Sequence, residues 1–218
     1  MTEECGDSLM QNIGHQSEDG GIYPTSPLQI ISITKYEAKD FIGKYHYLGY
    51  KPFRCSYAFG LSCGILMGVS VYHGLSAPET AVGAFGLQRN EQMGLWELGR
   101  LAVKPEFNGK NYGSFLIRRS IMLLRKQIQV KAVIAYADST YHNGAIYQAA
   151  GFTYCGLTDK KKDYFINGMI RERGKTKGAG GEWHNRPRKY KYIVILDKSL
   201  NLRWSILPYP KRNLCQNV

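Results

Sequence analysis

Apolar residues along the chain occur with two different periods that alternate through its middle part. Short apolar runs predict strands over residues 28–34, 54–61, 64–72, 95–103, 131–138, 152–156, 189–196 and 203–207. Helical spacing predicts helices over residues 35–47, 111–128 and, as a shorter element, within 141–151. Residues 73–95 show no sustained period and are expected to form a long loop. Alternating strands and helices, flanked by hairpins, indicate a mixed α/β fold with a central sheet between helices.

Local signals support several of these boundaries. Thr34 precedes the first helical segment and is a residue type that caps helix N-termini. Gly151 ends the short helical segment as a C-cap glycine would. Asn167-Gly168 stands between strand-like halves of 163–173, which is typical of a type I′ hairpin.

Composition divides the chain into three segments. Residues 1–27 are polar and acidic and are expected to form a flexible tail. Residues 28–157 carry the alternating pattern of the core, and 158–218 form a basic hairpin or arm that completes the same domain. The chain of 218 residues is long enough for one well-buried domain.

The formal charge of +12 is unevenly distributed. The first 34 residues contain five acidic side chains and no lysine or arginine, whereas residues 158–191 contain eleven basic and four acidic side chains. Such a basic body indicates a polyanionic partner, although a solvated loop would have the same composition. The candidate DNA contacts are Lys160, Lys161, Lys162, Arg171, Arg173, Lys175, Lys177, Arg186, Arg188 and Lys189.

Other classes of protein are disfavoured by composition. No apolar run approaches the roughly 18 residues of a membrane span, so no membrane partner is expected. The polar N-terminus lacks the apolar centre of a secretory signal. Five scattered cysteines without a CxxC pair are typical of a reducing cytoplasm and argue against structural zinc.

The segment between the predicted strand 95–103 and helix 111–128 has the chemistry of a phosphate-binding loop. A helix N-terminus exposes unpaired backbone N–H groups, and Gly109 and Gly113 would let a diphosphate approach them. Lys110 adds positive charge, and Asn111 is a residue that tolerates the left-handed backbone region. A simple strand–helix connection would also fit these residues.

Two segments resemble the GNAT acyltransferase superfamily. The first reads VKPEFNGKNYG over 103–113, where that superfamily binds the pyrophosphate of coenzyme A; the second is NGAIYQAAGF over 143–152. Asn108 and Asn111 replace an Arg or Gln and a glycine of the usual loop. The resemblance implies a GNAT-like sheet that binds acetyl-CoA or a related acyl-CoA. The candidate contacts are Arg100, Val103, Asn108, Gly109, Lys110, Asn111, Gly113 and Ser114.

Further residues resemble the Mom family of phage DNA-modification proteins. They are Tyr45–Leu48, Glu97–Leu101, Asn111 and Ser114, Tyr136–Ser139, His142–Gly144, Ile146–Ala149, Arg188–Tyr192 and Leu207–Lys211. The resemblance implies that the substrate is double-stranded DNA in an infected bacterium. It also implies conversion of adenine N6 to a carbamoylmethyl adduct, which protects the DNA from restriction.

The two resemblances imply roles for individual side chains. Tyr147 stands where the superfamily often places the acid that protonates the leaving thiolate; Asp138 ends a buried strand, where ligands of α/β sheets bind. We expect these two residues and Tyr57 to be catalytic, although Tyr57 and Tyr147 would also suit a core. His46, Tyr47 and Asp138 are candidate ligands of a redox metal, Fe(II), because acetyl-CoA alone cannot form the carbamoylmethyl linkage.

Three functions compete on the sequence. The first is the DNA-modifying enzyme, which would have to extrude the adenine from the duplex. The second is a GNAT N-acetyltransferase that acts on a small-molecule amine or a protein lysine, and the third is a non-catalytic nucleic-acid-binding protein. The basic region argues against the second, and Tyr147 and Asp138 argue against the third. The sequence leaves the oligomeric state open.

Overall fold

A computed structural model of the chain describes residues 27–170 and 180–211. The predicted acidic tail, except Pro27, and the four candidate DNA contacts Arg171, Arg173, Lys175 and Lys177 lie outside these residues. The main sheet has seven strands in the order β1-β2-β3-β4-β5-β10-β6. They are β1 (Gln29–Ser32), β2 (Tyr57–Ser62), β3 (Leu66–Gly74), β4 (Leu95–Val103), β5 (Ala132–Asp138), β10 (Lys189–Ile195) and β6 (Thr153–Leu157).

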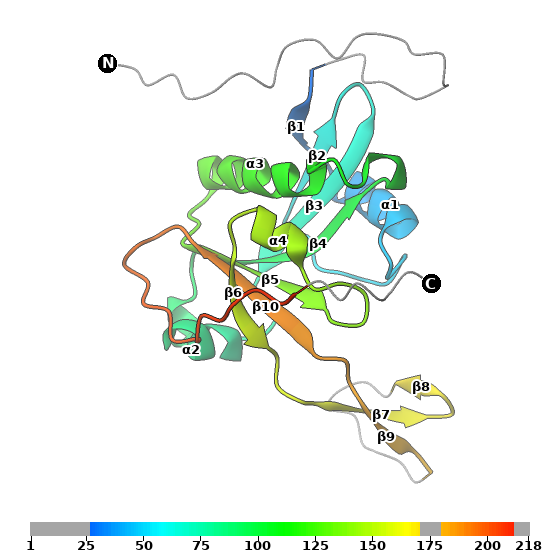
Figure 1. Cartoon of the computed structure of the whole chain (residues 1–218), viewed down its shortest axis with the longest axis vertical. Helices are drawn as coiled ribbons and strands as arrows, with labels where there is room; N and C mark the ends of the chain where they lie inside the picture. The colour runs from blue at the N-terminus through cyan, green and yellow to red at the C-terminus, as the bar shows by residue number, and fades with distance from the viewer. Residues whose placement is uncertain (1–26, 171–179, 212–218) are drawn as a thin grey trace.

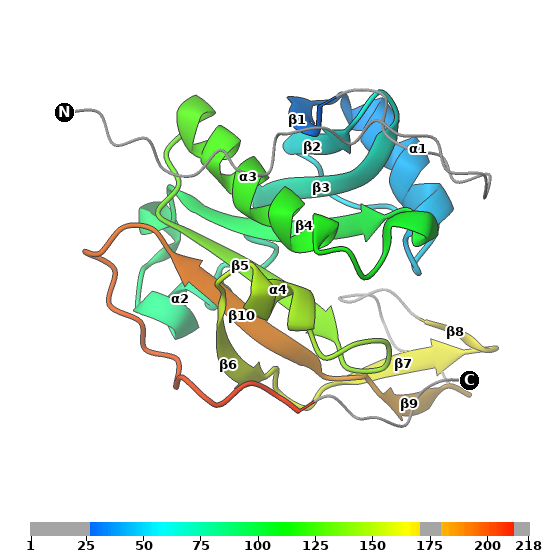
Figure 2. The same ribbon diagram turned by 45° about the horizontal axis from the view of Figure 1, so that its top comes forward.

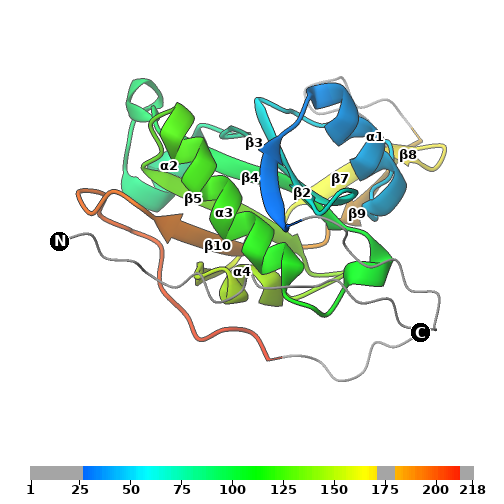
Figure 3. The same cartoon turned by 90° about the horizontal axis from the view of Figure 1, so that it is seen from above.

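Helices cover both faces of this sheet, so the predicted mixed α/β fold is confirmed (Figure 1). The helices are α1 (Lys35–Tyr45), α2 (Glu79–Phe85), α3 (Tyr112–Gln127) and α4 (Ala145–Ala149). One core lies between the sheet and α3 with α4, and it contains Phe59, Tyr72 and Leu98. The apolar residues of α1 form a second core with Val71. Those of α2 form a third core with Ile134. Figure 2 shows the resulting layers, and Figure 3 shows α3 lying across the strands.

The sequence explains where the two long helices form. Thr34 caps α1 through a reciprocal capping box: its hydroxyl accepts the Glu37 N–H, and the Glu37 carboxylate accepts the Thr34 N–H. Along α3, Leu116, Ile117 and Leu124 are fully buried, because their spacing places them on one face of the helix. The predicted cap and both predicted helices are therefore confirmed.

Strands β4 and β5 form the only parallel pair among the described strands, and they separate part-way along their length. Their pairing runs from Leu95 opposite Ala132 to Leu98 opposite Ala135. Beyond that row β4 stays paired with β3 and β5 stays paired with β10. A bulge at Gly99 begins the separation, since Leu98 pairs with Tyr72 and Arg100 with Val71. The carboxyl ends of β4 and β5 thus diverge.

Two predictions about chain segments were wrong. Residues 73–95, expected to be a loop, contain α2, whose Ala81, Ala84 and Phe85 pack against the sheet. Its seven residues are too few to show a helical period. Residues 203–207, expected to be a strand, are irregular. Trp204 packs against the core of α2, and the backbone of the segment is bonded to α2 and β6: Arg203 N–H donates to Ala84 O at 2.7 Å and Leu207 N–H donates to Tyr154 O at 3.0 Å.

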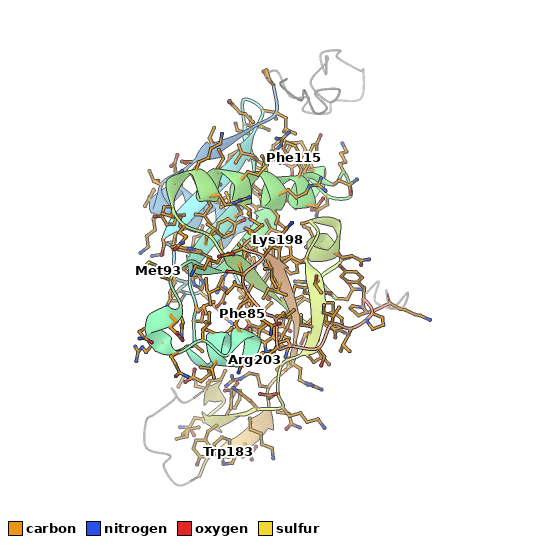
Figure 4. The ribbon with its side chains drawn as sticks, turned by 90° about the vertical axis from the view of Figure 1, so that its left-hand side faces the viewer. Phe85, Met93, Phe115, Trp183, Lys198 and Arg203 are labelled. Atoms are coloured by element: carbon orange, nitrogen blue, oxygen red, sulfur yellow. The ribbon has the colours of Figure 1, made fainter. Side chains whose placement is uncertain are left out.

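Between β6 and β10 the chain leaves the main sheet and forms a small sheet, which we call the arm (residues 158–188). It contains β7 (Lys162–Ile166), β8 (Met169–Ile170) and β9 (Glu182–Asn185) in the order β8-β7-β9. Asn167 and Gly168 have φ values of 52° and 74°, as the predicted hairpin turn requires. The arm projects from the main body (Figure 1), and Trp183 lies at the opposite end of the molecule from Phe115 of α3 (Figure 4).

The described helices include none with the length and apolar character needed to cross a lipid bilayer.

Candidate active site at the diverging ends of β4 and β5

The loop that precedes α3 has the backbone geometry predicted for a phosphate-binding turn. Asn111 is the N-cap residue of α3 and adopts the left-handed region, with φ 60° and ψ 6°, as its residue type predicted. Gly109 also has a positive φ of 76°. Asn108, Gly109, Lys110 and Asn111 are exposed, so the first turn of α3 presents its N–H groups next to an accessible loop. The Asn111 side chain makes no capping hydrogen bond.

Three other residues that were candidate donor contacts serve the packing of α3. A Cβ at Gly113 would lie 2.2 Å from Ile146 Cδ1, so the glycine leaves room for the Ile146 side chain where α3 approaches α4. The Ser114 hydroxyl donates to the carbonyl of Asn111 at 3.0 Å, and the residue is buried. Val103 ends β4 and packs in the cluster of Leu116. These positions fix the helix against the sheet beside the loop.

Four rings gather where α1 ends and the β5–α4 connection begins. The centroids of His46 and Tyr47 are 4.4 Å apart, and those of Tyr47 and Tyr141 are 4.2 Å apart. His142 meets Tyr47 edge-on at 6.2 Å. We call His46, Tyr47, Tyr141 and His142 the aromatic cluster. It joins two segments that are about 95 residues apart in the sequence.

Asp138 holds the turn that carries half of this cluster. One oxygen of the Asp138 carboxylate accepts the Thr140 N–H at 3.0 Å. The backbone carbonyl of Asp138 accepts the N–H groups of Tyr141 and His142 at 3.0 and 3.1 Å. The carboxylate is near enough to Tyr47 to contribute to the raised pKa of that phenol, of which burial is the larger cause. Asp138 is therefore both a structural cap and a charged group facing the cluster.

Arg100 of β4 supplies positive charge near the aromatic cluster. It follows the Gly99 bulge, donates to the Gly99 carbonyl at 2.7 Å and lies 5.6 Å from the centroid of the Phe53 ring. Burial lowers the pKa of His46 to about 4, and the charges of Arg100 and His142 add to this effect. His46 is consequently neutral at pH 7. Its Nδ1 accepts the Leu48 N–H at 3.1 Å, so the neutral ring carries its proton on Nε2.

Tyr147 lies beneath the cluster on α4 and keeps its proton at neutral pH. Burial raises the pKa of its phenol, and nearby tyrosines raise it further, while Arg100 partly offsets the shift. Its ring packs against Phe152 and Tyr192 at centroid distances of 5.8 and 5.3 Å. Tyr57 packs edge-on against Trp96 at 5.4 Å, in the core under α3, and its ring contact is not with the aromatic cluster.

The described part of the chain gives no support for the predicted iron site. There, no group of three or more histidine, cysteine, aspartate or glutamate side chains converges closely enough to hold a metal ion. His46 and Tyr47 stack face to face, and His46 Nδ1 is already occupied by a backbone N–H. These observations give no support for the expected Fe(II), and the set of His46, Tyr47 and Asp138 stays a prediction.

The base of the arm is attached beside Asp138. Lys189 is paired directly opposite Asp138 across β10 and β5, and both the N–H and the hydroxyl of Ser139 donate to Arg188 O, at 3.2 and 2.7 Å. Lys160, Lys161, Lys162 and Lys189 are exposed. Arg186 forms an ion pair with Asp163, and Arg188 Nε donates to Thr158 O at 2.6 Å, so both guanidinium groups also stabilise the arm.

Sequence reasoning gave no role to Tyr141 and His142, although both stand just after Asp138. The available signal was their position behind a buried strand that ends in an acid, a place where α/β sheets bind ligands. Their contact with Tyr47 was not visible in the sequence, because it depends on how the end of α1 meets the end of β5.

Comparison with known proteins agrees with this architecture and assigns the family. A sequence model of the Mom protein family matches residues 27–211. The chain belongs to the Mom protein family. None of the curated proteins matches the sequence.

Solved structures similar to this Mom family member are acetyltransferases. The ribosomal-protein-S18-alanine N-acetyltransferase of Escherichia coli is 13% identical, with a TM-score of 0.48 over 80% of this chain and 99% of that one. A putative acetyltransferase of Salmonella typhimurium with acetyl-CoA is 13% identical, with a TM-score of 0.48 over 78% and 95%. A Bacillus subtilis acetyltransferase in complex with CoA is 17% identical, with a TM-score of 0.44 over 78% and 99%.

Proposed function

We propose that this Mom family member is a DNA-modifying transferase that acts on adenine N6 and uses an acyl-CoA. Transfer of the acyl group joins N6 to the carbonyl carbon and releases the thiol, so the carbamoylmethyl adduct would in addition need a nitrogen donor and a bond from N6 to the methyl carbon. The observation that carries the proposal is the position of the basic arm. Lys189 at its base is paired opposite Asp138, so a bound polyanion would lie next to the aromatic cluster and the diverging strands. A transferase for small amines would not need cationic residues in that place.

The donor is proposed to bind at the start of α3. The first N–H groups of a helix have no intrahelical partners and carry partial positive charge, which suits a diphosphate. The exposed loop from Asn108 to Asn111 lets such a group approach. Lys110 would add a charge-assisted contact. The acyl arm would then run toward the place where β4 and β5 separate, beside Tyr147.

The surrounding side chains have suitable protonation states for transfer to an amine. Tyr147 retains its proton at neutral pH and can donate it to a departing thiolate. Neutral His46 carries its proton on Nε2 and acts as a hydrogen-bond donor, not as a base. Asp138 has a second carboxylate oxygen with which to accept a hydrogen from the adenine amino group. Arg100 would stabilise negative charge on the donor.

Mass spectrometry of nucleosides tests the proposal. DNA from cells that express the protein should contain a modified deoxyadenosine, and Asp138→Asn should abolish it while the protein remains folded. Asp40→Asn is the matched control, because Asp40 is exposed on α1 and pairs only with Lys44 at 2.8 Å, a contact of small energetic value. Unmodified deoxyadenosine in cells with abundant wild-type protein would reject the proposed function.

The alternative is an N-acetyltransferase that acts on a small-molecule amine or a protein lysine. The loop before α3 favours it as much as it favours DNA modification, because donor binding there requires no DNA. The two functions differ in product and in salt dependence. DNA affinity that falls steeply as salt increases, together with an adduct on adenine, would support the first; an acetylated amine without DNA binding would support the second.

A further inference from the structure

The aromatic cluster contains a column of three rings. His46 and Tyr47 are stacked, with centroids 4.4 Å apart and planes inclined by 28°. Tyr47 and Tyr141 continue the column at 4.2 Å and 35°. Exposure increases along it: His46 is partly buried, Tyr47 is 44% exposed and Tyr141 is 59% exposed. Because Tyr47 covers one side of the Tyr141 ring, the exposed area of Tyr141 belongs mainly to its other side.

The last ring of the column is held in place by the backbone. Tyr141 N–H donates to Asp138 O at 3.0 Å, and the Asp138 carboxylate caps the same turn through Thr140 N–H. His142, on the same turn, meets Tyr47 edge-on. Tyr141 is therefore a large exposed ring on a turn that is fixed by its backbone, an arrangement on which a planar ligand can stack.

The charges around the column indicate the chemistry of that ligand. Lys189 is exposed and paired opposite Asp138, three residues before Tyr141, and Lys104 lies 5.8 Å from the ring centroid of Tyr45, the neighbour of His46. Cationic side chains beside an open aromatic face are the combination by which proteins bind nucleic acids: phosphates contact the cations and a base stacks on the ring.

We propose that the open face of Tyr141 is a stacking platform for a purine base taken out of the DNA duplex. The base would extend the His46–Tyr47–Tyr141 column as a fourth ring and would lie beside Asp138. Tyr141 is then a positioning residue, since it holds the base without taking part in proton transfer. This inference rests on the proposed function, because it assigns the site where the substrate base is held.

A purine could also come from coenzyme A, whose adenosine carries the same ring. The structure favours the DNA base, because the proposed diphosphate site lies at the start of α3, whereas Tyr141 lies at the base of the arm. The two sources make different predictions. Loss of the Tyr141 ring should weaken DNA binding and leave the affinity for acetyl-CoA unchanged within about twofold.

The test uses a single-stranded oligonucleotide of pyrimidines with one central 2-aminopurine, whose fluorescence is quenched by stacking. A single strand needs no base extrusion, so the measurement isolates the stacking step. Wild-type protein should quench the emission on binding. Y141A should lose this quenching and bind roughly 5- to 150-fold more weakly, which is the range measured when a base-stacking ring is replaced by alanine. Y141F should behave as wild type, since stacking needs the ring and not the hydroxyl.

Two controls keep the result specific. Tyr36→Ala removes another exposed tyrosine, 82% exposed at the start of α1 and outside the cluster, and should change neither quenching nor affinity. The Tm of Y141A in thermal unfolding should be lower than that of wild type by only a few degrees, from the lost contact with Tyr47, because the hydrogen bonds of the turn are made by its backbone and by Asp138.

The outcomes separate this inference from the proposed function. The platform would be overturned if Y141A quenched the emission as wild type does, or if Y141A lost affinity for acetyl-CoA and not for DNA. Either result would count even if the DNA of expressing cells is modified. Conversely, normal quenching that depends on Tyr141 in a protein that yields no modified deoxyadenosine would support the platform and reject the proposed modification.

Discussion

Asn111 provides a direct test of how the loop before α3 works. Its left-handed backbone, with φ 60° and ψ 6°, is strained for most L-residues, and its side chain makes no capping hydrogen bond. Replacing it with alanine keeps a Cβ but removes a residue type that tolerates this region. We expect Asn111→Ala to lower the free energy of unfolding by about 1 kcal/mol. For a chain of this size that corresponds to a decrease in Tm of roughly 2–4 °C.

Asn111→Gly should have a much smaller effect on stability. Glycine adopts a positive φ without strain, but it also gives the unfolded chain more freedom, which costs about 0.4–1 kcal/mol. The two terms nearly cancel, so we expect a change within about 0.5 kcal/mol of the wild-type value. Because the N–H groups at the start of α3 are unchanged, acetyl-CoA should bind with a Kd equal to that of wild type or lower.

Thermal unfolding and isothermal titration with acetyl-CoA measure both effects in the same preparations. We expect wild type and Asn111→Gly to be equally stable and Asn111→Ala to be the least stable of the three proteins. If Asn111→Gly weakened acetyl-CoA binding tenfold, or about 1.4 kcal/mol, the Asn111 side chain itself would contact the donor. That result would refute the reasoning that backbone N–H groups alone hold the diphosphate.

Five other substitutions test the site, the fold and the arm. Tyr147→Phe should slow adduct formation by about 10²–10⁴-fold, the usual contribution of a general acid, with little change in Tm; an unchanged rate would exclude that role. Because the pKa of folded His46 is about 4 and that of the unfolded residue is 6.5, protons favour the unfolded state between these values. The free energy of unfolding should therefore fall as the pH decreases from 6.5 to 4, and it should fall less for His46→Gln than for wild type. Denaturant titrations at several pH values measure both. Gly144→Ala adds strain at φ 81° and places a Cβ 2.4 Å from a tyrosine ring carbon of β10, so we expect a loss of roughly 2–3 kcal/mol. Gly151→Ala, with φ 88° and no atom within 4 Å of the new Cβ, should lose only about half as much in the same melts. Lys161→Ala should reduce the salt dependence of log K for duplex DNA by about 0.9, and an unchanged slope would remove Lys161 from the contact surface.

The features that sequence reasoning predicted are those with local causes. Thr34 caps α1 because its hydroxyl and Glu37 are three residues apart, and Asn111 and the Asn167–Gly168 pair adopt positive φ because their residue types tolerate it. A strand followed by an amphipathic helix likewise has a short-range pattern. Each of these signals lies within a few residues of the structure that it determines.

The features that were missed depend on contacts between distant segments. The irregular segment 203–207 has strand-like composition, but its polar backbone groups are satisfied by α2 and β6. Tyr141 and His142 were missed because their place in the site depends on their contacts with Tyr47. Those contacts form only when the end of α1 packs near the end of β5. The position of β10 between β5 and β6 is also a property of the assembled sheet.

The two ends of the arm meet at a pair of reciprocal hydrogen bonds: Thr158 N–H donates to Lys189 O at 2.8 Å, and Lys189 N–H donates to the Thr158 hydroxyl at 2.9 Å. Everything between them is therefore inserted at one point of an otherwise continuous sheet. A two- or three-residue turn could join these ends and leave every strand of the main sheet in place. The arm can therefore change in length or sequence while the strands of the main sheet keep their places.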